Sequence, residues 1–371
     1  MNPKIYVIKK SNEDMLNISN IAKEYKVTED VASFFYYRDY NIKDYLINGI
    51  NEITQEINNY CNNFNQDELV KNFIQIIKNS KKVLVYSDYD ADGITSNTIF
   101  TKFLNYIKPY INNDIEIHSI AGDRLEGYGI KQNTIDEVIK DYKFDTIVTL
   151  DHGINDVDNV LGKLKNNNIK VITIDHHISE NINNNTFDIL MKPFDENISA
   201  GGLTFLFSYM ISKKLLNEDN LQYITSLSKY ACISQITDSV NFNKINYLIA
   251  KLGYYYLNNK NINFEESNLS LYRNKIITSN DIKFYIGPLL NAASRVSDAN
   301  IALNFLLESN QERAKQYLDV LLNLKQTRKE LQNSISNKLL NNKNCIDLFL
   351  KNNLITLLID SDNIKESEIP V

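Results

Sequence analysis

Two of the chain's four histidines lie side by side in Asp175-His176-His177, directly after the apolar run 171–174. That run is rich in β-branched residues and is typical of a short buried strand. Imidazole changes its charge near neutral pH and is a common metal ligand, and here it adjoins a carboxylate. The pattern therefore predicts metal binding or acid–base chemistry at the end of a strand.

Two further acidic segments also follow predicted strands. Residues 88–93 read Asp-Tyr-Asp-Ala-Asp-Gly after the run 83–86, and residues 151–153 read Asp-His-Gly after the run 146–150. Apolar strands that alternate with helical stretches indicate a parallel sheet covered on both faces. Ligands bind such sheets beyond the carboxyl ends of the strands. We therefore expect the three acidic segments to meet in space.

The residue types in these segments point to a divalent cation. Carboxylates as close as Asp88 and Asp90 repel one another unless a cation lies between them. Together with Asp151 and His176 they offer oxygen and nitrogen but no sulfur, which suits Mn²⁺ or Mg²⁺ better than structural zinc. Two ions about 3.5 to 4 Å apart, bridged by a shared carboxylate, would activate water and hold the leaving oxygen of a phosphate ester. The predicted reaction is metal-dependent phosphoester hydrolysis.

Several neighbouring residues keep two interpretations. A single Asp-x-Asp pair is usually a solvated turn, but three acidic segments after three strands favour ligands. Asp92 is either a third acid of the site or the cap of the following helix. His152 either contacts the metal or points away from it. His118, within the strand-like run 115–120, is more consistent with a buried or edge histidine.

Composition limits the class of protein. The chain has 371 residues, 43% of them hydrophobic, and a formal charge of −6, so it can form more than one domain and is not a polycation. Nucleic-acid binding would need a local basic groove or metal ions. The N-terminus lacks an apolar signal core and no run nears the roughly 20 residues of a membrane span, so we expect a cytoplasmic protein without membrane contact. Cys61, Cys232 and Cys345 lack CxxC spacing, which argues against disulfides and thiolate zinc.

The hydrophobic patterns predict an α/β fold, a parallel doubly wound sheet with a helical N-terminal arm and a long C-terminal connector helix. A capping box at 309–312 begins a helix of about 30 residues, on the order of 45 Å long. The run 354–359 reads as a further strand. The predicted regions are a helical arm in 1–80, a catalytic α/β domain in 81–260, a phosphate-contact motif and connector in 261–345, and the start of a truncated second domain in 346–371.

Taken together, these segments resemble the DHH phosphoesterase superfamily, whose signature triplet corresponds to residues 175–177. The first motif of the superfamily matches residues 88–93, the second matches Asp151, and the fourth matches Asp238 at the end of Ile-Ser-Gln-Ile-Thr-Asp. Four motifs in the same order form a specific signature. The resemblance implies a metal-dependent phosphodiesterase.

Within this superfamily the chain looks most like the RecJ family of single-strand-specific 5′-to-3′ DNA exonucleases. That likeness rests on Arg-Leu-Glu-Gly-Tyr-Gly at 124–129 and on residues 286–299, and it spans about residues 40 to 345. It implies single-stranded DNA as the substrate and two Mn²⁺ or Mg²⁺ ions as the cofactor.

The resemblance also implies a role for individual residues. His177 would face the scissile phosphate, either as a hydrogen-bond donor or as an acid for the leaving group. Arg295 would grip a phosphate with its planar fork, supported by Asn291, although a surface ion pair with Asp298 is the other interpretation of Arg295. Asp151 would bridge the two ions. The residues implied to hold the metal are Asp88, Asp90, Asp151, His176 and Asp238.

The chain departs from the RecJ family in its C-terminal part. The family has a Gly-Gly-His motif in a second domain, but no glycine follows Gly287 and no histidine follows His177. Leu289 and Ser294 stand where the family commonly has a basic residue and a glycine. We expect a chain without this nucleotide clamp, which a second polypeptide could supply. Two alternatives stay open: hydrolysis of short oligonucleotides or cyclic dinucleotides, and a non-catalytic scaffold or partner subunit.

Overall fold

The computed structural model describes residues 11–131, 135–136, 142–156, 160–179, 184–194, 197–259, 268–269 and 276–340. The chain divides into two compact units, residues 1–56 and 57–371. The second unit contains a five-stranded sheet and all three acidic segments. The boundary between the units falls within helix α3.

The described part of the first unit is helical. Its first helix begins at Ser11, whose hydroxyl accepts a hydrogen bond from the Asp14 backbone N–H at 3.0 Å, while the Asp14 carboxylate accepts from the Ser11 N–H at 2.8 Å. This capping box satisfies two donors at the helix start. A small core of Ile18, Ala22 and Ala32 packs the unit. Its elements are α1 (Asn12–Tyr25), α2 (Glu29–Tyr36), the 3-10 turn η1 (Ile42–Tyr45) and the beginning of α3 (Ile50–Cys61).

The sheet of the second unit is entirely parallel, with the strand order β2-β1-β3-β4-β5. Val85 of β1 pairs with Val148 of β3, which pairs in turn with Ile172 of β4, so the three central strands end at the same level. The four strands predicted from the sequence are confirmed, whereas β5 was not predicted. The strands are β1 (Lys82–Ser87), β2 (Glu116–Ala121), β3 (Thr146–Leu150), β4 (Lys170–Ile174) and β5 (Ile189–Met191).

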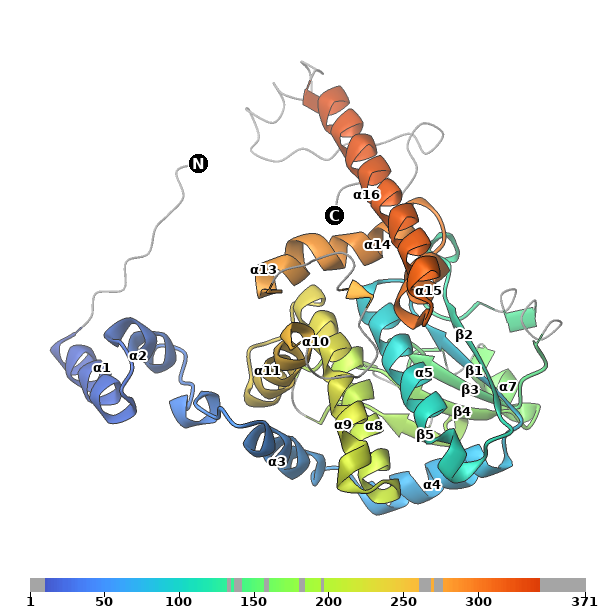
Figure 1. Ribbon diagram of the computed structural model, residues 1–371, viewed down its shortest axis with the longest axis horizontal. Helices are drawn as coiled ribbons and strands as arrows, with labels where there is room; N and C mark the ends of the chain where they lie inside the picture. Colours follow the sequence, from blue (N-terminus) through green and yellow to red (C-terminus); the bar gives the residue numbers. More distant parts are fainter. Residues whose placement is uncertain are drawn as a thin grey trace. The chain divides into compact units, whose positions relative to one another are not determined.

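Helices cover both faces of this sheet (Figure 1). On one face α5 packs against β1, β2 and β3 and against α8 and α10. On the other face Leu84, Tyr86 and Ile147 form a buried core with Leu161 and Leu164. Burial on two sides explains why the strands read as continuous apolar runs. The predicted α/β doubly wound class is confirmed. The helices are α4 (Gln66–Asn79), α5 (Ala91–Ile111), α7 (Gly162–Asn166), α8 (Ala200–Leu215), α9 (Glu218–Ser226), α10 (Ser228–Thr237) and α11 (Lys244–Asn258).

The strand order places a topological switch point between β1 and β3. After β1 the chain crosses to β2, which lies next to β1 on one side in the strand order. After β2 it returns to β3, which lies next to β1 on the other side. The connections after β1 and β3 therefore leave in opposite directions, which opens a crevice at their carboxyl ends. Two of the acidic segments begin there.

The predicted long helix is confirmed as the 30-residue helix α16, whose far end extends beyond the other helices of this unit (Figure 1). Its role as a connector to a second domain stays a prediction. Its first half packs against α14 and α15 and buries Ala314, Leu318 and Leu321. The run 354–359 lies outside the described residues, and the boundaries predicted at residues 80, 260 and 345 stay predictions. These C-terminal elements are α13 (Ser279–Asp281), the π-helical turn η5 (Ile282–Ile286), α14 (Gly287–Val296), α15 (Asn300–Leu307) and α16 (Gln311–Leu340).

Membrane insertion through a helix has no support in the described part of the chain. None of its helices combines the length and the apolar character that crossing a bilayer requires. The longest of them, α16, is largely polar on its outer face, where Lys315, Gln326 and Lys329 are exposed.

Candidate metal centre

The three acidic segments meet at the carboxyl ends of β1, β3 and β4, as the sequence predicted. Hydrogen bonds between neighbouring strands continue one residue beyond each strand, since the Asp88 N–H donates to the Leu150 carbonyl and the Asp151 N–H donates to the Ile174 carbonyl, both at 3.1 Å. These bonds set the three segments at one level. The parallel register therefore brings side chains far apart in the sequence to one edge of the sheet.

The first group of possible ligands consists of Asp88, Asp90 and Asp151, whose ligand oxygens lie within 4.8 Å of one another. Burial and the charge of Asp90 raise the pKa of Asp88 to about 7. Burial, followed by the charges of nearby carboxylates, also raises the pKa of Asp90 and of Asp151. Carboxylates that resist ionisation in this way gain most from a bound cation.

The turn after β1 can hold Asp88 and Asp90 close together because Asp90 caps the next helix and Gly93 leaves room for the backbone of Asp88. Asp90 caps α5, accepting hydrogen bonds from the N–H groups of Asp92 at 2.8 Å and Gly93 at 3.2 Å. A Cβ atom on Gly93 would lie 2.3 Å from the Asp88 carbonyl oxygen, so only glycine permits this close approach. The sequence left open whether Asp92 caps this helix, and in the structure the capping residue is Asp90.

Asp92 belongs to a second group of possible ligands, with His176 and Asp238. The His176 Nε2 atom lies 3.7 Å from Asp92 Oδ2 and 3.2 Å from Asp151 Oδ1, and His176 Nδ1 lies 3.9 Å from Asp238 Oδ2. Asp238 directly follows the last residue of α10. Sequence reasoning did not include Asp92 among the ligands, because its spacing alone was equally typical of a cap.

Contacts with a distant helix fix Asp92 in place. Its two carboxylate oxygens accept hydrogen bonds from the N–H groups of Ala200 and Gly201, each at 2.9 Å, at the start of α8. The Ser234 hydroxyl of α10 donates to the same carboxylate at 2.5 Å. A helix N-terminus carries a partial positive charge that stabilises an anion. Asp92 thereby joins α5, α8 and α10 beneath the acidic cluster.

Asp151 occupies the centre of the arrangement. It is part of the group with Asp88 and Asp90, and also of a third group with His176 and His177. Its backbone adopts φ +63°, a left-handed conformation that costs a non-glycine residue on the order of 1 to 2 kcal/mol. Its Oδ1 atom is buried and has no hydrogen-bond partner among the described residues. A buried carboxylate oxygen that accepts no hydrogen bond from the described residues, on a strained residue and 3.2 Å from His176 Nε2, fits a metal ligand.

His177 is oriented by Asp175, the first residue of its triplet. Asp175 Oδ1 accepts hydrogen bonds from the His177 backbone N–H at 3.1 Å and from His177 Nδ1 at 2.8 Å, while Asp175 Oδ2 accepts from the Ile154 N–H at 3.0 Å. Burial opposes the charge of Asp175, but the bonds from His177 outweigh it and lower the Asp175 pKa. Burial likewise opposes the charge of His177, and Asp175 raises the His177 pKa overall.

The remaining histidines lie outside the three groups. His118 is on β2, an edge strand, and its ring packs on Tyr142 with centroids 4.7 Å apart, in agreement with the edge interpretation. His152 is fully buried, with its Nδ1 atom 3.6 Å from Asp156 Oδ2. Neither ring nitrogen of His152 has a hydrogen bond among the described residues.

A cluster of arginines lies beside the acids. Half-burial, followed by the charges of Arg124 and Arg328, lowers the pKa of Arg295 to about 10. The Nε atoms of Arg295 and Arg328 are both buried without a hydrogen-bond partner, and the Arg124 guanidinium lies 4.9 Å from the Tyr89 ring centroid. Within the described part of the chain no carboxylate pairs with these three cations. Sequence reasoning found Arg295 but missed Arg124 and Arg328, which lie in other elements.

Asn291, the other predicted substrate contact, and Asp298, the alternative partner of Arg295, both have partners within the fold. The Asn291 side-chain oxygen accepts a hydrogen bond from the Ala91 N–H at 2.8 Å, which attaches α14 to the first acidic segment. Asp298 Oδ1 accepts hydrogen bonds from the backbone and side chain of Asn300 instead of pairing with Arg295. Asn291 therefore holds the helix that carries Arg295, and Arg295 remains available to an anion.

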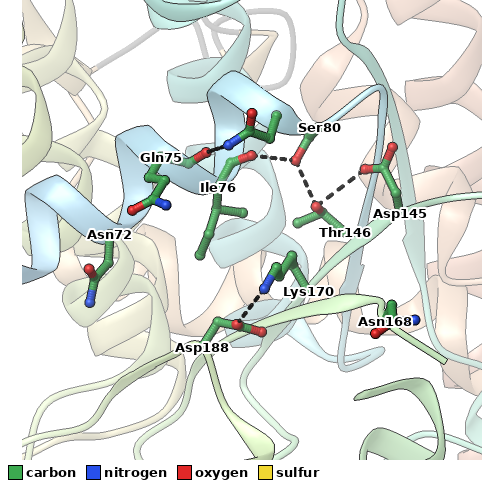
Figure 2. A pocket seen from close by; sticks show the side chains of 10 residues that line it. Asn72, Gln75, Ile76, Ser80, Asp145, Thr146, Asn168, Lys170 and Asp188 are labelled. Carbon is green, nitrogen blue, oxygen red and sulfur yellow. Dashed lines mark hydrogen bonds and ion pairs between the residues drawn. The ribbon is translucent and has the colours of Figure 1, made fainter. Parts of the chain in front are cut away.

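A polar cavity of about 410 Å³ lies at the opposite, amino-terminal edge of the sheet (Figure 2). Its polar groups satisfy one another: Ser80 and Thr146 hydroxyls are 2.7 Å apart, and Asp188 pairs with Lys170 at 3.2 Å. Asp145 accepts hydrogen bonds from the N–H groups of Lys81 and Lys82 at the start of β1. These pairings join α4 to the strand starts, so this cavity lacks the unpaired groups that distinguish the acidic cluster.

Comparisons with known proteins agree with the motifs. Residues 82–231 match the model of the DHH family, N-terminal domain, which confirms the resemblance drawn from the sequence. The single-stranded-DNA-specific exonuclease RecJ of Haemophilus influenzae is 24% identical over 72% of this chain and 48% of its own length. RecJ of Bacillus subtilis is 28% identical over 71% of this chain and 32% of its own length. The chain thus spans half or less of the length of these relatives.

Solved structures share the fold. A crystal structure of exonuclease RecJ bound to manganese has a TM-score of 0.61 and 24% identity, and covers 74% of this chain and 69% of that one. RecJ of Thermus thermophilus in complex with Mn²⁺ has a TM-score of 0.69 and 20% identity, and covers 88% of this chain and 46% of that one. At these identities the likeness establishes the fold.

The raised pKa values predict how cation binding depends on pH. Asp88 and Asp238 have pKa values of about 7 and about 6, so both hold protons at pH 5.5 and release them by pH 7.5. A cation must displace these protons at the lower pH. We expect Mn²⁺ to raise the melting temperature more at pH 7.5 than at pH 5.5, measured by calorimetry. Without metal, stability should fall between about pH 4 and pH 7, where only the unfolded carboxyls ionise fully.

Two variants serve as controls for this measurement. Asp151→Asn should lose most of the Mn²⁺-dependent stabilisation at both pH values, because it removes the carboxylate common to two of the groups. Asp114→Asn, in the exposed turn before β2, should behave like the wild type. An equal effect of Mn²⁺ on wild-type protein at both pH values would contradict the assignment.

Proposed function

We propose that this chain, which matches the DHH family N-terminal domain over residues 82–231, is a metal-dependent phosphodiesterase that degrades single-stranded DNA from its 5′ end. One observation carries the proposal. The Asp151 carboxylate lies between two sets of ligand atoms and has an oxygen without a hydrogen-bond partner among the described residues. A shared carboxylate between two cation positions is the arrangement used by two-metal phosphodiesterases.

In this proposal the described side chains supply both metal positions. Asp88, Asp90 and Asp151 would hold one ion, and Asp92, Asp151, His176 and Asp238 would hold the other. Oxygen and nitrogen ligands without sulfur suit Mn²⁺ or Mg²⁺. Such ions, when bound, lower the pKa of a water nucleophile and stabilise the leaving oxygen of a phosphodiester. Manganese and magnesium accompany RecJ in solved structures of that protein.

His177 would contact the substrate rather than stabilise the fold. Its ring is about two-fifths exposed, whereas Asp175 behind it is fully buried. Its Nδ1 atom is 2.8 Å from Asp175 Oδ1, so Nε2, which lies 3.4 Å from the Tyr128 hydroxyl, would be the nitrogen for the substrate. Because Asp175 raises the His177 pKa, a larger fraction of the ring is protonated at neutral pH. A protonated ring can donate to a phosphate oxygen or to the leaving oxygen.

The arginine cluster would hold the DNA backbone beside the metal ions. Arg124, Arg295 and Arg328 come from three separate elements and repel one another, so an anion among them relieves the repulsion. The planar guanidinium fork matches the oxygens of a phosphate. Backbone contacts of this kind do not read base identity, so no sequence preference is expected. We extend the predicted role of Arg295 to Arg124 and Arg328.

Further features of this proposal rest on the family resemblance. Digestion from the 5′ end, a role in DNA repair and recombination, and a cytoplasmic location are inferred from it. A second polypeptide that completes the nucleotide clamp also belongs here, and co-purification from the source cell would test it. A non-catalytic scaffold would have no use for the strained Asp151 carboxylate among other negative charges. The presence of this carboxylate therefore favours an enzyme over a scaffold.

Asp151 provides the test of the activity. With Mn²⁺, the wild type should shorten end-labelled single-stranded DNA from the 5′ end and cleave dinucleotides more slowly. Asp151→Asn should lower kcat about 10³-fold, because a loss of ~4 kcal/mol of transition-state stabilisation corresponds to that factor. Asp114→Asn should retain full activity. Faster cleavage of dinucleotides than of long strands would favour the small-substrate alternative, and equal activity of Asp151→Asn would refute the proposed site.

Arg328 provides the test of the backbone contact. Arg328→Ala should raise KM for single-stranded DNA about 10- to 100-fold, as expected for losing a charged hydrogen bond worth ~1.5 to 3 kcal/mol. The slope of log affinity against log salt should become shallower by about 0.7. Arg313→Ala is the matched control, since Arg313 is on the same helix and pairs with Glu308 at 3.0 Å. If both variants bind DNA alike, Arg328 does not contact the substrate.

A further inference from the structure

Tyr128 joins two of the acidic segments through one hydroxyl group. This hydroxyl lies 3.0 Å from the Asp151 carbonyl oxygen, and 2.8 Å from Nδ1 and 3.4 Å from Nε2 of His177. Asp151 follows β3 and His177 follows β4, so the contact ties the ends of two neighbouring strands. Its hydroxyl is bound to the backbone of Asp151 and to the ring of His177, beside the three ligand groups. Its place at their edge calls for a role other than that of a ligand.

The hydrogen-bond donors and acceptors around Tyr128 define where the proton of its hydroxyl points and which nitrogen of the His177 ring is protonated. A carbonyl oxygen only accepts, so the single proton of the Tyr128 hydroxyl is donated to Asp151. The hydroxyl oxygen is then an acceptor for His177, which requires a proton on Nδ1. Asp175 Oδ1 also lies 2.8 Å from this nitrogen, so the two acceptors share its single proton in a three-centre hydrogen bond. In the neutral ring the lone pair is therefore on Nε2.

The loop around Tyr128 is shaped to deliver this side chain. Gly127 and Gly129 on either side have φ values of +83° and +85°, a conformation that glycine adopts without strain. A Cβ atom on Gly129 would lie 2.7 Å from Asp156 Oδ1, and the same carboxylate accepts a hydrogen bond from the Ile130 N–H at 3.2 Å. Asp156 thus anchors the loop on the β3 side.

We propose that Tyr128 is a positioning residue that holds the left-handed turn at Asp151 and the ring of His177 in fixed relation. The inference rests on the proposed function, because it assigns to Tyr128 the alignment of the Asp151 carboxylate with the imidazole of His177 that would face the substrate. The Asp151 backbone is in an unfavourable conformation, and a hydrogen bond to its own carbonyl oxygen helps to retain it. Tyr128 and Asp175 together hold the His177 ring, with the Tyr128 hydroxyl 2.8 Å from Nδ1 and 3.4 Å from Nε2 and with Asp175 Oδ1 2.8 Å from Nδ1.

Tyr128→Phe tests this role by removing the hydroxyl and keeping the ring, whose centroid is 5.1 Å from that of His177. Misalignment of reacting groups by about 1 Å can cost about 100-fold in rate, so we expect kcat to fall about 10- to 100-fold. KM for single-stranded DNA should change less than about threefold, because no substrate contact is lost. The unfolding midpoint should stay close to that of the wild type.

A spectroscopic measurement makes the test independent of activity. The chain has only four histidines, so ¹⁵N-labelled histidine gives a resolvable spectrum of the metal-free protein. Above the His177 pKa we expect the wild-type ring to show the Nδ1–H tautomer. In Tyr128→Phe the His177 signals should move or broaden, while those of His118, on the distant edge strand β2, should not.

Tyr142→Phe is the matched control. The Tyr142 hydroxyl also donates to a backbone carbonyl, that of Val83 at 3.4 Å, and its ring also packs on a histidine, His118. This variant should leave kcat and the His177 signals unchanged. Wild-type kcat with unaltered His177 signals in Tyr128→Phe would overturn the inference, as would changes in all four histidines with a lowered unfolding midpoint. If the wild type fails to degrade DNA, the proposed function is wrong, and the spectra still decide the role of Tyr128.

Discussion

The second unit of this protein is organised around the mutual repulsion of carboxylates that the parallel sheet holds together. Hydrogen bonds that continue beyond β1 and β3 set Asp88 and Asp151 at one level, and the short turn after β1 adds Asp90 beside them. Burial removes the water that would screen these charges, which raises the pKa values of all three acids. The arrangement is favourable only with protons or cations among the oxygens.

Helix N-termini and backbone N–H groups offset part of this repulsion. Asp90 accepts two hydrogen bonds at the start of α5, and Asp92 accepts two at the start of α8. Both helices therefore direct the positive ends of their dipoles at the acids. Asp151 has no such compensation, since its Oδ1 atom is buried without a hydrogen bond among the described residues and its backbone is strained. The carboxylate least stabilised by the fold is the one that two of the three ligand groups share.

A cationic surface adjoins this anionic centre without neutralising it. Arg124, Arg295 and Arg328 approach from a loop, from α14 and from α16, and burial and mutual repulsion lower the pKa of Arg295. A net charge of −6 therefore conceals a local site for anions. Asn291 connects the two regions, because its hydrogen bond to Ala91 fixes α14 against the first acidic segment. The proposed phosphate contacts and the proposed metal centre thus share one structural support.

The sequence by itself determined the parallel α/β class, four of the five strands and the meeting of the three acidic segments, because apolar runs and the residues that follow them are local signals. The sequence could not show that Asp90 rather than Asp92 caps α5, since the partner of Asp92 is the start of α8, more than 100 residues away. The placement of Arg328 and Tyr128 beside the acidic segments was likewise decided only by the tertiary structure. Their partners come from separate elements, and residue spacing along one chain carries no information about such contacts.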